Sequence, residues 1–480
     1  MSSRIVPKIV AFPLFTSTRR ILGLLVVVSG LFVSLPESPL GGRVVGLAGL
    51  GGNVAQAQAW LENREGKEGP GFRTGNIEWH PGLGVEAGYD SNLYLSPSGQ
   101  HVDSMILRVT PHLDISTLSR ERRDSLDDGA AANVERKVAF RLGLAAPFYH
   151  YFHATHRTNV AAQGDLNLTI RPDGRFSFSI DNKYRRNIRP FAFDGAGTYA
   201  FHRNVSGAVL KLATPGEVFT ARIGYDFIFN IFEDAAFAYL NNVANRGSFE
   251  MLWQFFPKTL LFFRSDVTHQ GYYGFNPENL HHPSYMVRLA DNTRVNAVVG
   301  MNGAFTPKVS LLAEIGYGAA FILRAPELSE VETVVGRAQL TLTPREALTV
   351  KFGYDRGIHP SFSGLYYTLD RGLFDIEAIL ARRFLLGFTF WAGYLSSGTV
   401  LNAYGGPLDL SGRTDRTDVV VDGKLRAEYR IRDWIAITAS AGVTWDKTGF
   451  QYNRFVITPL LPVPSSFVKY EAFLGCRVFY

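Results

Sequence analysis

The sequence predicts an all-β protein: a transmembrane antiparallel up-and-down β-barrel of about 18 strands, after an N-terminal signal peptide. Three observations predict this fold. Apolar and polar residues alternate along the chain from Ile77 onward, tight turns alternate with long polar connections, and the chain ends on a strand whose last residue is the aromatic Tyr480. A membrane-spanning sheet must close on itself, because lipid cannot satisfy the hydrogen bonds of an unpaired strand edge.

The N-terminus resembles an export signal. Arg19 and Arg20 precede an apolar run at 21–33, and small residues in an Ala-x-Ala pattern follow near Ala57 and Ala59. A transmembrane anchor is the alternative explanation of the apolar run. The expected organisation is a signal peptide at 1–57 with cleavage near Ala57 or Ala59, a flexible lead-in at 58–76, and an outer-membrane β-barrel at 77–480.

Composition excludes several classes of protein. The mean hydropathy of +0.00 excludes a membrane protein built from many apolar helices, but it suits a barrel whose apolar and polar residues alternate. Aromatic residues make up 13%, enough for two interfacial girdles. The single cysteine, Cys476, excludes an intramolecular disulfide and a cysteine-rich metal site. Much of the basic excess falls within the expected signal peptide, so nothing indicates nucleic-acid binding.

The alternation is clearest at 418–431. Val419, Val421 and Leu425 fall on one face of an extended strand, whereas a helix would spread the intervening charges around its whole circumference. A barrel of this width encloses water, so the charged face would line the lumen. The alternative is a set of solvated charges that pair with neighbours along the wall. The residues expected to line the lumen and the solute path are Arg108, Arg141, Arg222, Glu250, Arg264, Asp266, Arg337, Asp422, Lys424, Arg426, Glu428 and Arg430.

The connections alternate in length. Tight turns with proline, glycine or charged residues are expected at 171–174, 214–216, 256–258, 306–308, 343–345, 381–383 and 432–433. Long segments are expected at 149–157, 183–203, 232–246, 271–293, 322–330, 355–366, 395–418 and 446–465. Outer-membrane barrels have short periplasmic turns and longer outer loops. An even number of strands would place both termini in the periplasm, although the connection at 119–136 is long where a tight turn is expected.

The last strand, 467–480, resembles the C-terminal recognition signal of bacterial outer-membrane barrels in Gly475, Val478 and Tyr480. The resemblance implies that this strand closes the barrel and engages the barrel-assembly machinery. Two residues depart from the signal: tyrosine replaces the commoner terminal phenylalanine, and Phe473 occupies a usually polar position. The buried edge of a soluble β-sandwich is the alternative.

No catalytic motif accompanies this pattern. The sequence has no nucleophile elbow, zinc-ligand pair or phosphate-binding loop in a suitable context, so we expect a protein that is not an enzyme and needs no cofactor. No metal site is expected either. The one weak candidate is the cluster His150, His153 and His156, which alternates between faces of an extended strand and is more simply an amphipathic rim segment.

The first strand suggests a family. Gly88, Tyr89, Asp90 and Asn92, followed by a second strand with Pro111 and Leu113, resemble the opening of a family of bacterial β-barrel porins associated with exopolysaccharide secretion. The resemblance implies an outer-membrane conduit for a polysaccharide, supplied by a periplasmic polysaccharide export protein. The physical alternative is a girdle tyrosine followed by a side-chain-capped turn, and both explanations can hold.

We therefore expect a channel embedded in outer-membrane lipid, with export of an exopolysaccharide as the leading function and no nucleic-acid partner. A general or sugar-selective diffusion porin is the first alternative. A barrel enzyme acting on lipid or peptide is a more distant one.

Overall fold

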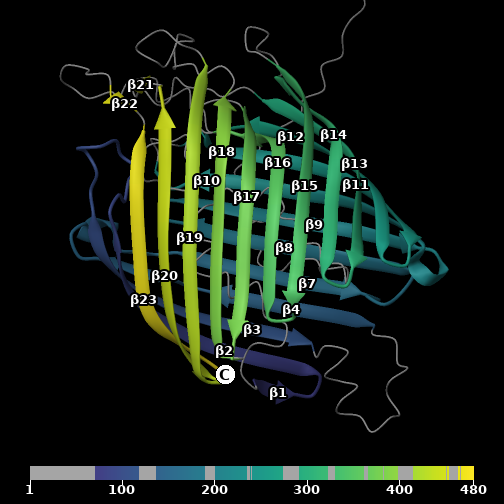
Figure 1. Ribbon diagram of the computed structural model, residues 1–480, viewed down its shortest axis with the longest axis horizontal. Coiled ribbons are helices and arrows are strands. Elements are labelled where there is room, and N and C mark those ends of the chain that lie inside the picture. Colours follow the sequence, from purple (N-terminus) through teal and green to yellow (C-terminus); the bar gives the residue numbers. More distant parts are fainter. Residues whose placement is uncertain are drawn as a thin grey trace, which may run out of the picture.

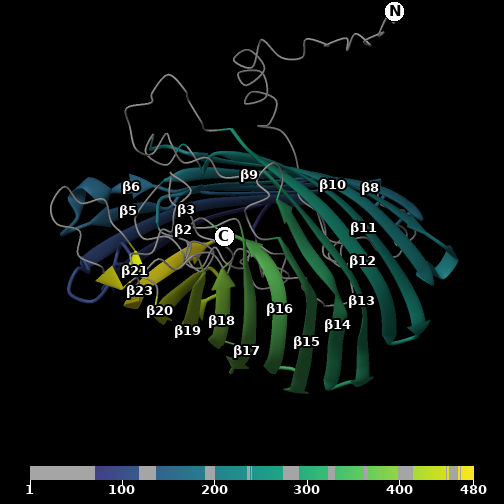
Figure 2. The same cartoon turned by 90° about the horizontal axis from the view of Figure 1, so that it is seen from above.

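The computed structural model describes residues 71–117, 137–189, 200–234, 238, 240–273, 291–322, 330–361, 366–381, 383–397, 415–449, 451–452, 463–464 and 466–480. Eighteen antiparallel strands form one closed barrel (Figures 1 and 2). The expected export signal and the whole connection at 119–136 lie outside the described residues. The fold class predicted from the sequence is confirmed.

The wall follows the order of the chain, and each strand pairs with its sequence neighbours. The strands are β2 (Ile77–Asp90), β3 (Ser104–Thr117), β4 (Val138–Ala145), β5 (Phe148–Tyr151), β6 (Asn159–Val160), β7 (Ala162–Ile170), β8 (Phe176–Asn187), β9 (Phe201–Ala213), β10 (Phe219–Phe232), β11 (Asn242–Phe256), β12 (Thr259–Tyr272), β13 (Asn292–Thr306), β14 (Val309–Ile322), β15 (Val331–Arg345), β16 (Leu348–Pro360), β17 (Tyr366–Leu380), β18 (Phe384–Ser397), β19 (Arg416–Arg432), β20 (Ile435–Thr448) and β23 (Phe467–Phe479).

Two pairs of short strands each form one interrupted strand of the wall. β4 and β5 pair with β3 in a single continuous register, and β7 and β6 pair with β4 and β5 in the same way. Pro147 lies at the first interruption, where it has no N–H for the ladder, but its carbonyl accepts from Ala161 N at 2.8 Å. Pro147 therefore interrupts the hydrogen-bond ladder between β4 and β5 without shifting the register of the strand.

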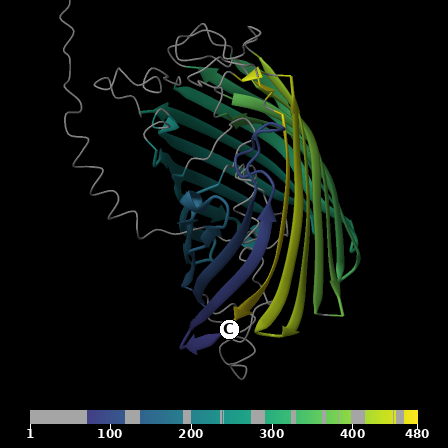
Figure 3. The ribbon, with the colours of Figure 1, turned by 90° about the vertical axis from the view of Figure 1, so that its left-hand side faces the viewer.

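The barrel closes between the first and last long strands. β2 pairs with β23 from Gly82↔Phe479 to Asp90↔Glu471, and Figure 3 shows the two strands side by side. In Figure 1 the steep strands of the near wall cross the strands of the far wall, as expected for the tilted strands of a barrel. No strand edge of the cylinder is left open along this seam.

Short elements lie at the ends of the barrel. β1 (Phe72–Thr74) pairs with the start of β2, so part of the lead-in that we expected to be flexible is a strand. The Phe72 ring lies 4.5 Å from the ring of Tyr480. Two single-turn 3-10 helices, η4 (Thr155–Arg157) and η5 (Pro215–Glu217), and the pair β21 (Gln451–Tyr452) and β22 (Val463–Pro464) lie in the connections.

Short and long connections alternate as predicted, but several boundaries were wrong. The expected long segments 183–203, 232–246 and 355–366 include the last residues of β8, the first residues of β11 and the last residues of β16. The expected turn at 343–345 is the end of β15, and the chain reverses at 346–347 instead. The expected outer segment at 149–157 begins inside the wall, because Tyr149 and Tyr151 belong to β5. At 343–345, the proline that follows a threonine was interpreted as a chain reversal. Proline is also tolerated at the end of a strand, and here it lies in the last residues of β15.

The two faces of the wall differ in polarity. Large apolar side chains point outward and are exposed, including Ile223 at 51% and Leu474 at 62%. The alternate positions, such as Asp226 and Arg477, point inward and are buried or half-buried. The wall therefore has an apolar outer surface suited to lipid and a polar inner surface suited to water. Among the described residues, no helix has the length and apolar character needed to cross a membrane.

Candidate functional site

The inner face of the barrel is the candidate site. By strand alternation, the structure places all twelve predicted lumen residues on this face: Arg108, Arg141, Arg222, Glu250, Arg264, Asp266, Arg337, Asp422, Lys424, Arg426, Glu428 and Arg430. Their role in a solute path stays a prediction.

Most of these charges pair along or across neighbouring strands. Arg222 donates to Glu250 at 2.8 Å, and Arg264 approaches the same carboxylate at 3.3 Å. Glu428 accepts from Arg430 at 3.0 Å and from Arg477 at 2.7 Å. Cross-strand pairs of opposite charge stabilise a sheet, so these residues stabilise the barrel wall and also make its inner face polar. These pairs agree with the alternative explanation given for the charged face, in which the charges pair with neighbours along the wall.

The seam between β2 and β23 contains a buried ion network. The Asp90 carboxylate accepts from Arg189 at 2.6 Å and from Lys469 at 2.8 Å, and Arg189 also donates to Glu471 at 2.9 Å. Beside it, Arg108 donates to Glu86 at 2.6 Å. Burial alone would lower the pKa of Arg189, but Glu471 and Asp90 together raise that pKa well above its ordinary value. The network joins the first strand, the last strand and a connection from elsewhere in the chain.

The residues that resemble the porin family lie at this seam. Gly88 leaves room for the Phe473 ring, since a side chain at Gly88 would collide with the ring and with the Ala472 carbonyl. Tyr89 points outward and donates to Asp103 at 3.0 Å. Asn92 donates to the Val468 carbonyl at 3.2 Å, which ties the end of β2 to β23. In this structure, Gly88, Asp90 and Asn92 of the motif therefore contribute to closing the cylinder.

Gly475, from the barrel-closure signal, lies at the same seam. A side chain there would collide with the Val85 carbonyl and with Glu86. Val478 points outward, and the backbone N–H of Tyr480 donates to the Pro81 carbonyl at 3.1 Å. These contacts hold the end of the chain against β2.

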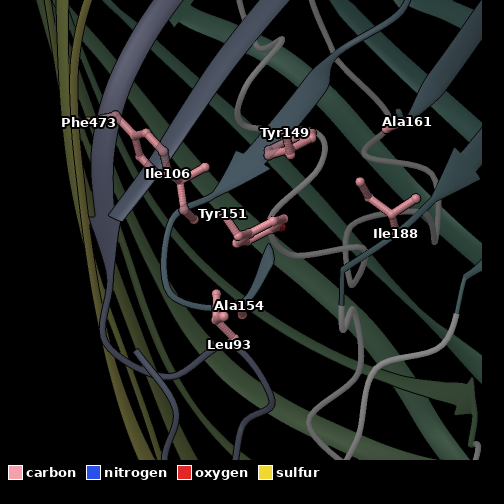
Figure 4. Close-up of a cluster of buried hydrophobic side chains, with 8 residues drawn as sticks. All are labelled: Leu93, Ile106, Tyr149, Tyr151, Ala154, Ala161, Ile188 and Phe473. Atoms are coloured by element: carbon pink, nitrogen blue, oxygen red, sulfur yellow. The ribbon is translucent and has the colours of Figure 1, made fainter. Parts of the chain in front are cut away.

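The connection that follows β8 turns into the barrel. Ile188 is 3% exposed and packs in a cluster with Ile106 and Phe473 from the inner wall (Figure 4). Arg157 donates to the Ile188 carbonyl at 2.9 Å. Because Arg189 reaches the β2–β23 seam, segment 188–189 crosses the inner faces of the strands between β8 and β2. We call it the inner strap. The other members of the cluster are Leu93, Tyr149, Tyr151, Ala154 and Ala161.

The sequence did not indicate the inner strap. Residues 183–203 were expected to form an outer connection, and nothing local marks Arg189 as the partner of Asp90, which lies 99 residues earlier. Phe473 was the one available signal, because it departs from the usual polar residue at its position. The structure explains this departure, since Phe473 fills the space left by Gly88 and packs against the cluster.

The three histidines of the weak metal candidate do not converge on one point. His150 contacts Thr158 Oγ1 at 3.2 Å through Nδ1, and His156 contacts the Tyr94 hydroxyl at 3.1 Å through Nε2. The backbone N–H of His153 donates to Ser104 Oγ at 3.1 Å. Within the part of the chain that the structure describes, no group of three His, Cys, Asp or Glu residues is arranged to hold a metal ion.

Polar residues also cluster on the outer face near the long connections. Arg186 donates to both carboxylate oxygens of Glu233, at 2.6 and 2.9 Å, and His202 lies 3.0 Å from the same group. Hydrogen bonding from Arg186 holds the pKa of Glu233 below its ordinary value of 4.5. The Tyr184 hydroxyl contacts His202 Nδ1 at 2.7 Å. This outer polar group marks the end of the apolar surface on β8 and β9.

The sequence matches no protein-family model and no curated protein. Solved structures with a similar arrangement include OccK2 (OpdF) of Pseudomonas aeruginosa, at 9% identity and a TM-score of 0.43, covering 84% of this chain and 98% of that chain. The FrpB iron transporter of Neisseria meningitidis is similar at 9% identity and a TM-score of 0.41, covering 84% and 81%. OmpT of Vibrio cholerae is similar at 9% identity and a TM-score of 0.38, covering 85% and 99%. The assignment of the fold rests on the strand pairing of the chain itself.

Proposed function

We propose that this protein is a channel of the bacterial outer membrane through which small hydrophilic solutes diffuse. The observation that supports this most directly is the closed wall with an apolar outer face and inward-facing charges of both signs. Closed antiparallel barrels of this size characteristically span outer membranes and enclose an aqueous lumen. In this arrangement both chain ends lie in the periplasm, on the side of the short turns.

The inner strap favours small solutes. Ile188 and Arg189 lie inside the wall and pack against inward-facing side chains of β3, β5 and β23. A segment of chain held inside a cylinder reduces the cross-section available to a solute. A diffusion channel tolerates such a constriction, whereas a conduit for a hydrated polymer needs a wider path.

Reconstitution of the full chain into planar bilayers and liposomes tests this proposal. We expect discrete, stable conductance steps in potassium chloride, and swelling of liposomes in small neutral sugars but not in large oligosaccharides. Heat-unfolded protein in the same detergent is the control. Absence of conductance steps above that control would overturn the proposal.

Export of an exopolysaccharide is the second candidate, supported by the resemblance at Gly88, Tyr89, Asp90 and Asn92. Because several of these residues form contacts at the closure seam, the resemblance can reflect barrel construction rather than cargo. Deletion of the gene separates the two functions. Loss of surface polysaccharide with unchanged uptake of small solutes would favour export through a periplasmic partner.

A further inference from the structure

Three arginines converge on the inner face near the ends of β9, β11 and β13 that lead into the long connections. Arg246 pairs with Asp226 at 2.7 Å. Arg203 instead donates to the amide oxygen of Asn230 at 3.3 Å, and Arg294 donates to that of Gln270 at 3.0 Å. Among the described residues, neither Arg203 nor Arg294 forms an ion pair with a carboxylate, in contrast to Arg222, Arg264 and Arg430. The positive charges of Arg246 and Arg294 both repel that of Arg203, so the three guanidinium groups lie within electrostatic reach of one another.

Amide side chains surround these guanidinium groups. Asn230 is paired in register with Arg203 on one side and with Asn242 on the other. Gln270 is paired in register with Asn292, two residues from Arg294. Both amide atoms of Asn292 and the Nε of Arg294 are buried without a hydrogen-bond partner in the structure. Buried polar atoms normally have partners, so this group has free donors and acceptors for a bound molecule.

Asp266 attracts Arg294 electrostatically, but among the described residues no carboxylate forms an ion pair with Arg203 or Arg294. Asp226 is paired with Arg246, and Asp266 lies deeper along β12, where it accepts from Asn296 at 3.4 Å. Guanidinium groups recognise carboxylates through charge-assisted hydrogen bonds, and amides recognise hydroxyl groups through both donors and acceptors. The group is therefore suited to one molecule that has both functions.

We propose that Arg203, Arg294 and Asn292 form an anion-binding subsite in the lumen, and that its ligand is an acidic sugar. The carboxylate lies between the two guanidinium groups, and the hydroxyls contact Asn292 and the neighbouring amides. The subsite rests on the proposed channel function and specifies its solute class. Its position toward the long connections places it at the entrance for a solute that comes from outside the cell.

Single-channel recording with galacturonate and galactose as probes tests the subsite. The two sugars have the same ring size, and only the first has a carboxylate. We expect galacturonate to interrupt the current through the unmodified channel at concentrations at least about tenfold lower than galactose, since one charge-assisted contact suffices for that difference. The double variant Arg203→Gln with Arg294→Gln should abolish this preference while conductance steps persist.

A matched control removes the same charge elsewhere. Arg222→Gln with Arg264→Gln deletes two inward arginines that pair with Glu250, and it should shift ion selectivity but keep the preference for galacturonate. Asn292→Asp, of the same size, should weaken galacturonate block by introducing a repelling charge. Equal block by both sugars in the unmodified channel overturns the subsite while leaving the channel function intact. Loss of the preference in the control variant also overturns it, whereas absence of conductance in the unmodified protein contradicts the channel itself.

Discussion

At the scale of single residues, the buried charges of the closure seam depend on one another. Asp90 is 0% exposed and is satisfied by Arg189 and Lys469 together. Desolvation of a charge costs free energy that only close partners recover, so a network of this kind is sensitive to the loss of one member. The seam is therefore the place where a change of one atom should have a large effect.

Replacing Asp90 with asparagine tests this. The change keeps the size of the side chain but leaves Arg189 and Lys469 with Glu471 as their only remaining carboxylate in the network. We expect the free energy of unfolding to fall by about 3–5 kcal/mol. Urea unfolding in detergent or liposomes measures it. Lys211→Gln removes a pair with Glu217, which is 53% exposed, and should cost less than about 1 kcal/mol. Equal losses in the two variants would contradict the prediction.

At the scale of strands, the sequence predicts the faces of the wall but not the contacts between them. Alternation is a local property, so the outward side of 418–431 could be assigned from the order of residues in that segment alone. Pairing partners such as Arg189 and Asp90 are distant in sequence and depend on register and on the path of a connection. The same limit explains the error at 343–345, where turn residues lie at the end of a strand.

The subsite residues illustrate a further limit. In the sequence, Arg294 looks like any other inward arginine, and Arg203 falls in segment 183–203, which was expected to be an outer connection. Their distinguishing property is that neither forms an ion pair with a carboxylate in the part of the chain that the structure describes, which depends on side-chain positions across five strands, β9 to β13. The twelve residues predicted to line the lumen were found from alternation, whereas the absence of a partner could be recognised only in the folded wall.

Gly88 provides a prediction at this scale. A methyl group there would collide with the Phe473 ring and the Ala472 carbonyl, so Gly88→Ala should force β2 and β23 apart and cost about 1–3 kcal/mol. The fraction of protein that runs as a folded band before heating in gel electrophoresis measures closure. Gly247→Ala is the matched control, since no heavy atom lies within 4 Å of the added carbon. A Gly88→Ala protein that folds as completely as the control would contradict the proposed role of the glycine.

At the scale of the whole molecule, the inner strap joins a connection in the first half of the chain to the first and last long strands, β2 and β23. Arg189 contacts β2 through Asp90 and β23 through Glu471, while Arg157 holds the neighbouring Ile188 carbonyl. The constriction is thus held by the closure seam rather than by the strand that precedes it. Width of the lumen and integrity of the seam should change together.

Arg189→Gln separates these contributions. The variant loses the ion pairs that hold the strap to the seam, so the strap should spend time away from the wall and single-channel conductance should become larger and noisier. Planar-bilayer recording measures both quantities. Lys211→Gln, which changes a pair near the short turns, should leave the current unchanged. A steady current of unaltered size in Arg189→Gln would show that the strap does not restrict ion flow.

The position of the strap also constrains the order of assembly. β23 is the last of the described strands along the chain, and its pairing with β2 is the contact that closes the cylinder. Ile188 and Arg189 belong to a connection in the first half of the chain, yet they lie on the inner side of that final junction. They either enter the forming cylinder before its last two edges meet or thread in afterwards through the open mouth. High salt that is present only during insertion into the membrane would weaken the ion pairs of Arg189 while the barrel closes. If the strap must enter before closure, a fraction of the channels recorded after the salt is removed should lack the strap in the lumen. If the strap can thread in afterwards, every channel should regain it.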